Sequence, residues 1–238
     1  MDTDNLTKKG ELQEKINAFK NNEYDIMLGT QMVAKGLNFP NLKLVGVILA
    51  DTALHLPDFR SAERTFSLIT QVAGRAGRFF PDGKVLVQTY SPEREPILFS
   101  VNNQTQKFYE MEINNRRMLN FPPFCRLVRL VFRAPTEKQA VEAAEGASSI
   151  LRNELYAIYS QKISPDFTQE QKNKVASTEI LGPAECPLSK IAGSFRWQII
   201  LKGQDITILQ KAASNLFYNY LRPTDVYIET DVDPVNLL

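Results

Sequence analysis

The sequence predicts an α/β fold: a first domain built on a parallel sheet with helices on both faces, then a smaller α+β domain. Before residue 103, helical periodicity alternates with strands rich in Val, Ile and Leu, which is typical of parallel sheets. Phe121–Phe124 reads FPPF, and consecutive prolines cannot continue a helix. Beyond this break the order is strand, helix, two strands, helix, strand, a split βαβ arrangement with the helices on one sheet face. We therefore expect domains at 1–103 and 125–238, joined by a linker at 104–124.

The first domain is predicted from its apolar spacing. Leu12, Ile16 and Phe19 lie on one face of an N-terminal helix, and an apolar-periodic run leads up to Ala73. Gly74 and Gly77 should end that second helix and let a ligand approach the backbone closely. In order, the predicted elements are a helix at 11–21, strands at 24–28 and 42–50, a helix at 59–73 and a strand at 83–90.

The linker and the second domain follow from longer patterns. A polar helix at 95–119 should break near Asn102-Asn103. On the strand predicted at 195–202, the alternation places Phe195, Trp197, Ile199 and Leu201 on a core face. The remaining predictions are strands at 126–133, 177–181 and 226–231 and helices at 136–161 and 206–221.

Composition narrows the class of protein. The 238 residues are 43% hydrophobic and 23% charged, enough to bury a sizeable core. A formal net charge of +1 gives no overall attraction to nucleic acid, so any contact with DNA needs a local basic patch. Two cysteines argue against a disulfide framework and fit a reducing cytoplasm. We expect no signal peptide and no membrane span.

Two segments have the residue types that bind phosphate. GTQMVAKGLNF follows a predicted strand, and it offers Thr30 and Gln31 as neutral hydrogen-bonding groups and Lys35 as a charge. QVAGRAGR ends the later helix with Arg75 and Arg78, whose planar guanidinium groups match phosphate oxygens. Alone, the second segment could be an ordinary basic helix end. The first segment, the buried strand and Asp51 come before it in the order expected of a helicase's second motor lobe.

Longer runs carry a family resemblance. GTQMVAKGLNFPN, ADTALHLPDFRSAERTFSLITQVAGRAGR, ILGPAECPLSKIAGSFRWQIILK and DVDPVNLL together are similar to primosomal protein N′, the PriA-type replication-restart helicases. The resemblance covers nearly the whole chain, and it implies that the first domain is part of a RecA-like helicase lobe 2. GTQMVAKG then corresponds to helicase motif V and QVAGRAGR to motif VI.

The resemblance also implies roles for single residues. Thr30 and Gln31 would lie near the DNA backbone and the nucleotide, with Lys35 close by, and all three would bind DNA. Gln71 would face the γ-phosphate of ATP, and Arg75 and Arg78 would be arginine fingers. The ATP phosphates would be bound by Gly74, Arg75, Arg78 and Asp51.

The sequence departs from the family pattern in two parts of the family's proteins, the first motor lobe and the zinc module. The first motor lobe, with its Walker A lysine and its acidic residues for Mg²⁺, has no counterpart here, so ATP and Mg²⁺ would be held mostly by that lobe. The family's zinc module is also missing, because Cys125, Cys186 and His55 do not have metal-ligand spacing. We therefore expect a C-terminal part of a longer protein, without ATPase activity alone and without a metal of its own.

The family function implied is an ATP-driven 3′→5′ DNA helicase that recognises stalled replication forks and assembles the primosome. Its partners would be fork and single-stranded DNA, single-stranded-DNA-binding protein and other primosome proteins, in the cytoplasm. Two alternatives stay open. The second domain could be a non-catalytic adaptor for DNA or partners, or the chain could only brace the motor.

The remaining candidates each have a structural alternative. Asp51 could hold nucleotide or form a helix-entry turn. Arg129 and Arg196 could belong to a basic patch that tracks single-stranded DNA, or to a solvated face with ion pairs to nearby glutamates. For Asp231 and Asp233 we favour a strand end and turn over a metal pair. Cys125 and Cys186 are expected to be buried thiols without a nucleophilic role.

Overall fold

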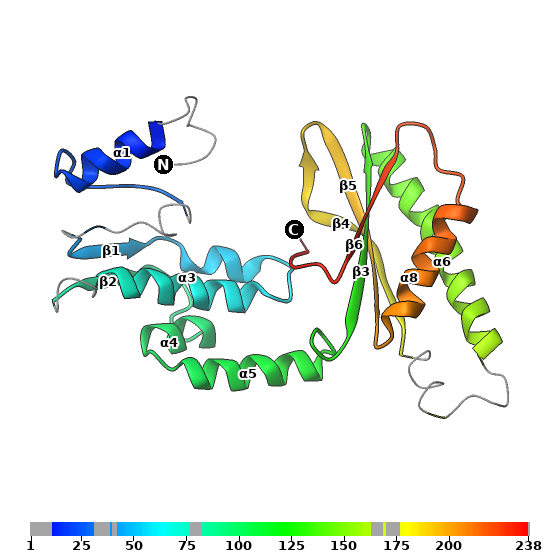
Figure 1. Cartoon of the computed structure of the whole chain (residues 1–238), viewed down its shortest axis with the longest axis horizontal. Coiled ribbons are helices and arrows are strands. Elements are labelled where there is room, and N and C mark those ends of the chain that lie inside the picture. Colours follow the sequence, from blue (N-terminus) through cyan, green and yellow to red (C-terminus); the bar gives the residue numbers. More distant parts are fainter. Residues whose placement is uncertain are drawn as a thin grey trace. The chain divides into compact units, whose positions relative to one another are not determined.

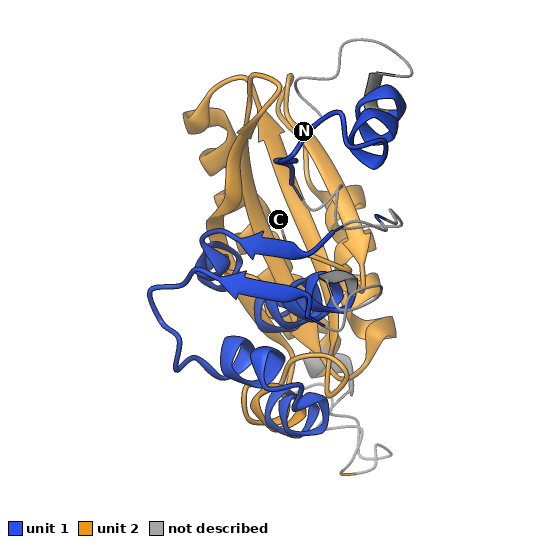
Figure 2. Cartoon of the chain, turned by 90° about the vertical axis from the view of Figure 1, so that its left-hand side faces the viewer, with its two compact units in different colours: residues 1–56, 60–112 blue, residues 57–59, 113–238 orange. Residues whose placement is uncertain are grey.

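The computed structural model describes residues 11–30, 39, 42–76, 82–162, 169 and 177–237. The chain forms two compact units. Unit 1 holds residues 1–56 and 60–112, and unit 2 holds 57–59 and 113–238; Figure 2 colours them separately. The boundary at 112/113 falls inside the predicted linker. The transfer of residues 57–59 to unit 2 was not predicted.

Unit 1 is built around a parallel pair of strands. Val45 of one strand lies opposite Val85 of the other in the register. The two strands pack against a small core of Ala50, Ile69 and Ile97. A second contact stacks Phe66 on the fully buried Phe108, with ring centroids 4.0 Å apart. The elements are α1 (Glu11–Lys20), β1 (Leu44–Val47), the 3-10 helix η2 (Ala50–His55), α3 (Ser61–Ala76), β2 (Lys84–Val87), α4 (Glu95–Val101) and the part of α5 (Thr105–Met118) up to Glu112.

Three sequence predictions about unit 1 are wrong in detail. Residues 24–28 form no strand, and Tyr24, Ile26 and Leu28 are exposed. Alternating apolar residues form a strand only where a neighbouring strand takes their hydrogen bonds. Within the described ranges β1 and β2 pair only with each other, so residues 24–28 have no such neighbour there. Among the described residues, one face of this strand pair packs on the core, while Leu44 and Leu86 on the other face are exposed.

The third correction concerns Gly74. It does not end its helix, since α3 continues to Ala76. A glycine inside a helix costs only about 1 kcal/mol relative to alanine, which the packing of Phe66, Ile69 and Val72 offsets. The predicted break near Asn102-Asn103 is confirmed, because α4 ends at Val101 and α5 begins at Thr105.

Unit 2 confirms the predicted split βαβ order. Its four strands form an antiparallel sheet in the order β4-β5-β3-β6, and Figure 1 shows α6 and α8 on the same side of that sheet. The elements are β3 (Arg126–Ala134), α6 (Glu137–Lys162), β4 (Glu179–Ile191), β5 (Ser194–Gly203), α8 (Ile206–Asn219) and β6 (Tyr227–Val232).

The main core of unit 2 lies between the sheet and these two helices. Phe132 from β3 and Ile199 from β5 meet the Ala-rich side of α6, whose small side chains let the helix lie close to the strands. The predicted core face of β5 is confirmed, since Phe195 and Trp197 also pack against this cluster. The buried members on α6 and α8 are Ala140, Ala143, Ala144, Ala147, Leu151, Ile158, Ile208, Leu209, Ala212, Ala213 and Leu216.

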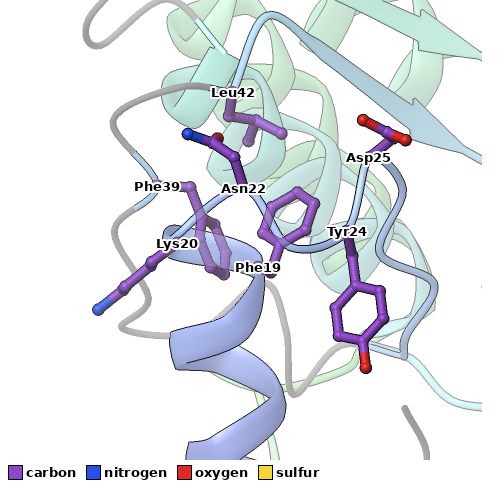
Figure 3. A pocket seen from close by; sticks show the side chains of 7 residues that line it. All are labelled: Phe19, Lys20, Asn22, Tyr24, Asp25, Phe39 and Leu42. Carbon is purple, nitrogen blue, oxygen red and sulfur yellow. The ribbon is translucent and has the colours of Figure 1, made fainter.

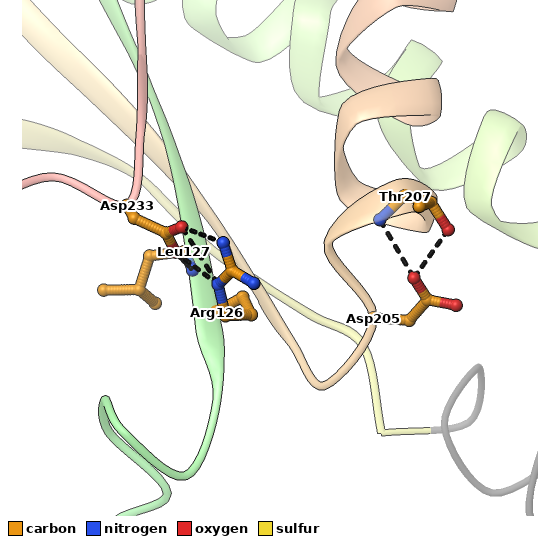
Figure 4. A network of polar contacts seen from close by, with 5 residues as sticks. All are labelled: Arg126, Leu127, Asp205, Thr207 and Asp233. Carbon is orange, nitrogen blue, oxygen red and sulfur yellow. Dashed lines mark hydrogen bonds and ion pairs between the residues drawn. The ribbon is translucent and has the colours of Figure 1, made fainter.

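Local contacts fix both helices. Asp205 is the N-cap of α8, and its carboxylate accepts hydrogen bonds from the Thr207 N–H and hydroxyl at 2.9 and 2.6 Å (Figure 4). Beyond the other end of α8, the Tyr220 hydroxyl donates to the Ala143 carbonyl of α6 at 2.9 Å. Gly146 leaves the space that the Tyr220 ring occupies, since a Cβ there would lie 3.3 Å from the ring. None of the described helices combines the length and hydropathy needed to cross a membrane.

From this core we predict very different losses of stability for two substitutions. Phe132→Ala should destabilise unit 2 by about 3–5 kcal/mol, because it removes a fully buried ring and leaves a cavity. Leu221→Ala, at a side chain that is 95% exposed, should change stability by less than about 0.5 kcal/mol. Urea unfolding followed by the fluorescence of Trp197, the single tryptophan, reports on this unit. Equal effects of the two substitutions would contradict this core.

Candidate functional site

Helix α3 carries the predicted motif VI residues. Its apolar side buries Phe66, Ile69 and Val72, which leaves Gln71 and Gly74 exposed. Arg75 belongs to the last turn of α3, but its side chain is outside the described part of the chain, and Arg78 lies outside it altogether. Space is open around Gly74, where a Cβ would meet no atom within 4 Å. The exposed side of α3 can therefore be approached by a ligand at its C-terminal turns.

The predicted motif V residues are less well defined. Thr30 is exposed and follows the irregular segment that replaces the predicted strand. Gln31 and Lys35 fall outside the described residues. Their assignment to the DNA backbone stays a prediction.

Asp51 lies at the carboxyl edge of the parallel strand pair, where α/β sheets place functional groups. Its side chain is buried, and both carboxylate oxygens accept hydrogen bonds at 2.8 Å, one from the Tyr90 N–H and one from the Thr89 hydroxyl. The Tyr90 N–H, and then the Thr89 hydroxyl, lower the pKa of Asp51 below its usual value of 3.8. These bonds tie η2 to the residues after β2 and give Asp51 a structural role. Its contact with ATP phosphates stays a prediction.

The predicted basic patch in unit 2 is a different kind of structure. Arg129 and Arg196 are only 4% and 7% exposed, so both the exposed DNA-facing patch and the solvated face are wrong for these two residues. Arg129 donates to the Gln198 side-chain oxygen at 2.7 Å and approaches the Cys186 sulfur at 3.7 Å. Arg196 donates to the Leu188 carbonyl at 3.1 Å, within an irregular stretch of β4.

Other arginines of this region pair with acids near the chain's end. Arg133 donates to Glu229 at 2.5 Å. Arg126 pairs with Asp233, which also accepts the Leu127 N–H at 3.3 Å (Figure 4). Arg126, and then the Leu127 N–H, lower the pKa of Asp233. The favoured structural role of Asp233 is therefore confirmed. Nowhere in the described ranges do three or more His, Cys, Asp or Glu residues gather as a metal site would need.

A hollow in unit 1 shares no residue with the predicted sites (Figure 3). Phe19 and Phe39 meet edge to face there, with ring centroids 5.1 Å apart. Its lining is completed by Lys20, Asn22, Tyr24, Asp25 and Leu42. The hollow joins the end of α1 to the irregular segment after it and adds no chemistry to the motif residues.

Sequence reasoning missed Asp58 and Phe59. Asp58 is buried, and its carboxylate accepts the Leu237 N–H at 3.0 Å. Phe59 stacks on Phe121 with ring centroids 5.5 Å apart and an interplanar angle of 7°. No spacing rule signals these contacts, because the partners are far apart in the sequence. The only signal was the position of an acid and an aromatic residue directly after Pro57.

Comparison with known proteins yields two family matches. Residues 117–235, half of the chain, match the model of the primosomal protein N C-terminal domain. Residues 3–80 match the model of the helicase conserved C-terminal domain. The second range includes every predicted motif V and motif VI residue, and the first includes Arg129 and Arg196.

Curated relatives match along the whole chain. The replication restart protein PriA of Treponema pallidum is 40% identical over 238 residues, which cover all of this chain and 33% of the relative. The protein of the same name from Borreliella burgdorferi is 36% identical over 225 residues, 94% of this chain and 31% of the relative. That of Bacillus subtilis is 36% identical over 241 residues, all of this chain and 28% of the relative. The chain thus spans a third or less of the length of these relatives.

The hydrogen bonds of Asp51 predict a pH dependence in unit 1. Because the pKa of Asp51 is lower in the folded state, its ionised form adds stability that is present above 3.8 and is lost as pH falls through the folded pKa. Asp51→Asn should lower stability at about pH 7, since an amide cannot accept both bonds, and should flatten the loss between about pH 5 and pH 2. Thermal unfolding across this range measures both effects. Asp82→Asn, at an exposed carboxylate of the same unit, is the control and should leave the profile unchanged.

The cysteines predict low reactivity in the native chain. Cys125 and Cys186 are buried and free, and burial raises the pKa of both thiols, to about 11 for Cys125. At about pH 8 only about one Cys125 thiol in a thousand is then a thiolate. Labelling with a thiol-specific disulfide reagent should be slow in buffer and fast in urea. Complete labelling of the folded chain within minutes would contradict this environment.

Proposed function

The chain belongs to the primosomal protein N′ (PriA) family, and from this premise we propose that it is the C-terminal part of an ATP-dependent 3′→5′ DNA helicase that restarts stalled replication forks and assembles the primosome. The observation that carries the proposal is the order of the two family matches. A helicase C-terminal domain with both motif segments comes first, and a primosomal C-terminal domain follows.

The chemistry proposed for unit 1 is charge stabilisation at a neighbouring lobe's nucleotide. Gln71 and Arg75 are four residues apart, so they lie on the same side of α3. The C-terminal end of a helix repels anions, and a phosphate there requires compensating guanidinium groups. Arg75 and Arg78 supply this charge as arginine fingers for the γ-phosphoryl group, while the exposed Gly74 leaves room for the phosphates.

Motif V completes the proposed coupling. Thr30, Gln31 and Lys35 bind the DNA backbone, while ATP and Mg²⁺ are held mostly by the first lobe of the longer protein. Closure of the two lobes on ATP and their release after hydrolysis then become steps along the strand. The chain alone lacks the Walker A lysine and hydrolyses no ATP above background.

The partners proposed are fork and single-stranded DNA, single-stranded-DNA-binding protein and other primosome proteins, in the cytoplasm. Two buried free thiols support a reducing compartment. The zinc module belongs to the longer family members. The burial of Arg129 and Arg196 does not favour the alternative of a non-catalytic DNA adaptor, because it removes the basic surface on which that alternative depended.

A chimera tests the arginine-finger role. This chain replaces the matching third of the Treponema pallidum relative, with which it aligns over all 238 residues. The chimera should hydrolyse ATP in the presence of forked DNA, and Arg75→Ala should lower that rate by about 10³–10⁵. Arg75→Lys should recover little, since a point charge does not replace the planar fork.

The matched control is Arg152→Ala, at an exposed arginine of α6. It should leave hydrolysis unchanged, and this chain alone should show only background turnover. Wild-type rates in Arg75→Ala, or robust hydrolysis by the separate chain, would contradict the proposed function.

A further inference from the structure

We propose that a bulge in strand β4 is a DNA contact, which inserts an apolar side chain at the end of a duplex. Every residue involved belongs to unit 2, and the choice of DNA as the ligand rests on the proposed function. The starting point is the run ILGPAECPLSKIAGSFRWQIILK, which the motor chemistry does not use. It forms most of β4, a turn at Ala192-Gly193 and most of β5.

The bulge is visible in the pairing of β4 with β5. Glu185 of β4 lies opposite Trp197 of β5. Five residues later, Lys190 lies opposite Phe195, which is only two residues away on β5. The intervening residues of β4, 186–189, therefore include more than the ladder can pair, and we call them the β4 bulge.

Two buried arginines hold the β4 bulge from below. Arg129 and Arg196 alternate with the core residues of β3 and β5, so they lie on the sheet face away from α6 and α8. Figure 1 shows the β4–β5 hairpin bending toward that same side. Arg129 approaches the Cys186 sulfur at 3.7 Å. Arg196 donates to the Leu188 carbonyl at 3.1 Å. Both arginines are buried and therefore act as positioning residues for the bulge, not as contacts of their own.

The outer side of the β4 bulge is apolar and exposed. Leu188 is 51% exposed, and Ile191 beside the turn is 40% exposed. Lys190 is exposed as well, and its ammonium lies 4.4 Å from the Phe195 centroid. The Leu188 carbonyl cannot move without breaking a hydrogen bond of the buried Arg196, which is costly. The exposed Leu188 side chain therefore projects from a backbone that is held in place.

The β4 bulge also lies in a positive field. The acceptor that Arg196 meets there is a neutral carbonyl, so this bond does not cancel its charge. Burial raises the pKa of the Cys186 thiol, but Arg129 and Arg196 act in the opposite direction. The effect of each arginine is larger than that of Glu229, an acid that opposes them. Buried charges are screened little by salt, and a positive field attracts phosphates.

An apolar tip above fixed positive charge fits the end of a DNA duplex. Proteins that unstack DNA insert apolar side chains such as leucine between bases, while cations hold the phosphates. Unstacking costs least at a duplex end or fork junction, where a base pair has a neighbour on one side only. Leu188 then meets the terminal base pair, and Lys190 meets the phosphates beside it. A pocket on another protein would require the leucine but not the two charges beneath it.

The test of the apolar contact uses the same chimera and a forked DNA with 2-aminopurine in the base pair next to the junction. Binding should raise the fluorescence of this base, because it is unstacked. Leu188→Ala should abolish most of the rise and weaken binding by about fivefold or more, and Leu188→Met should keep both. The matched control is Leu221→Ala, at a leucine of unit 2 that is 95% exposed, and it should leave both unchanged.

The charge and the anchor are tested on the same DNA. Lys190→Gln should reduce the slope of log K against log salt by about 1, whereas Lys211→Gln, at an exposed lysine of α8, should not. Arg196→Ala should lower the fluorescence rise in protein that urea unfolding shows to be folded, and Arg196→Lys should recover part of it. Combined with Leu188→Ala, it should add no further loss, because Arg196 acts through the bulge.

An unchanged fluorescence rise in Leu188→Ala, or an equal loss in Leu221→Ala, would overturn the DNA contact and leave Leu188 as a contact for another protein. ATP hydrolysis is followed in the same samples. A chimera that hydrolyses ATP with forked DNA but shows no fluorescence rise overturns the bulge contact alone. A normal rise without hydrolysis supports the bulge contact and counts against the proposed function.

Discussion

The architecture of unit 2 depends on one constraint: its sheet buries both faces, but α6 and α8 cover only one of them. The opposite face carries Arg129, Arg196 and Lys202, each buried. A buried cation is stable only where oxygens, sulfurs or aromatic rings replace its water. Arg129 meets the side-chain oxygen of Gln198 on β5 and the sulfur of Cys186 on β4, and Arg196 meets the Leu188 carbonyl of β4. Lys202 meets Glu179 of β4 and, from the turn at residues 119–125, the Leu119 carbonyl and the Phe121 ring.

Residues 57–59, which belong to unit 2, contribute to the cover of this face. The cluster around Leu127 and Ile200 needs apolar cover, and Phe59 provides part of it. In unit 1, Gln71 and Gly74 are exposed on α3.

Much of this fold could be predicted from the sequence, because its main elements are periodic. The split βαβ order and the core face of β5 follow from alternation alone, and the apolar side of α3 follows from helical spacing. The strand predicted at 24–28 is not observed, because a strand forms only where a neighbouring strand takes its hydrogen bonds. The residues of one segment do not show whether such a neighbour is present. Gly74 failed as a helix end because tertiary packing outweighed its low propensity.

Candidate site residues could be named from the sequence only where a binding chemistry requires residue types at a fixed spacing. Arg75 and Gln71 could be named as candidates because guanidinium and amide groups at a helix end are a recognisable pattern for phosphate binding, and their role stays a prediction. The burial of Arg129 and Arg196 was not predictable, since it depends on the fold of β4 over the sheet. Asp58 and Phe59 gave no signal in their spacing, because their partners are set by topology and not by neighbouring residues.

The hydrogen bond between Asp58 and Leu237 joins residues that are 179 positions apart in the sequence. Closing so long a loop is entropically costly until the contacts around it have formed. During synthesis, residues 57–59 emerge long before β6 and the segment that follows it. Residues 57–59 therefore remain without these partners while α6, β4, β5 and α8 are made, and this part of unit 2 closes only at the last stage of folding.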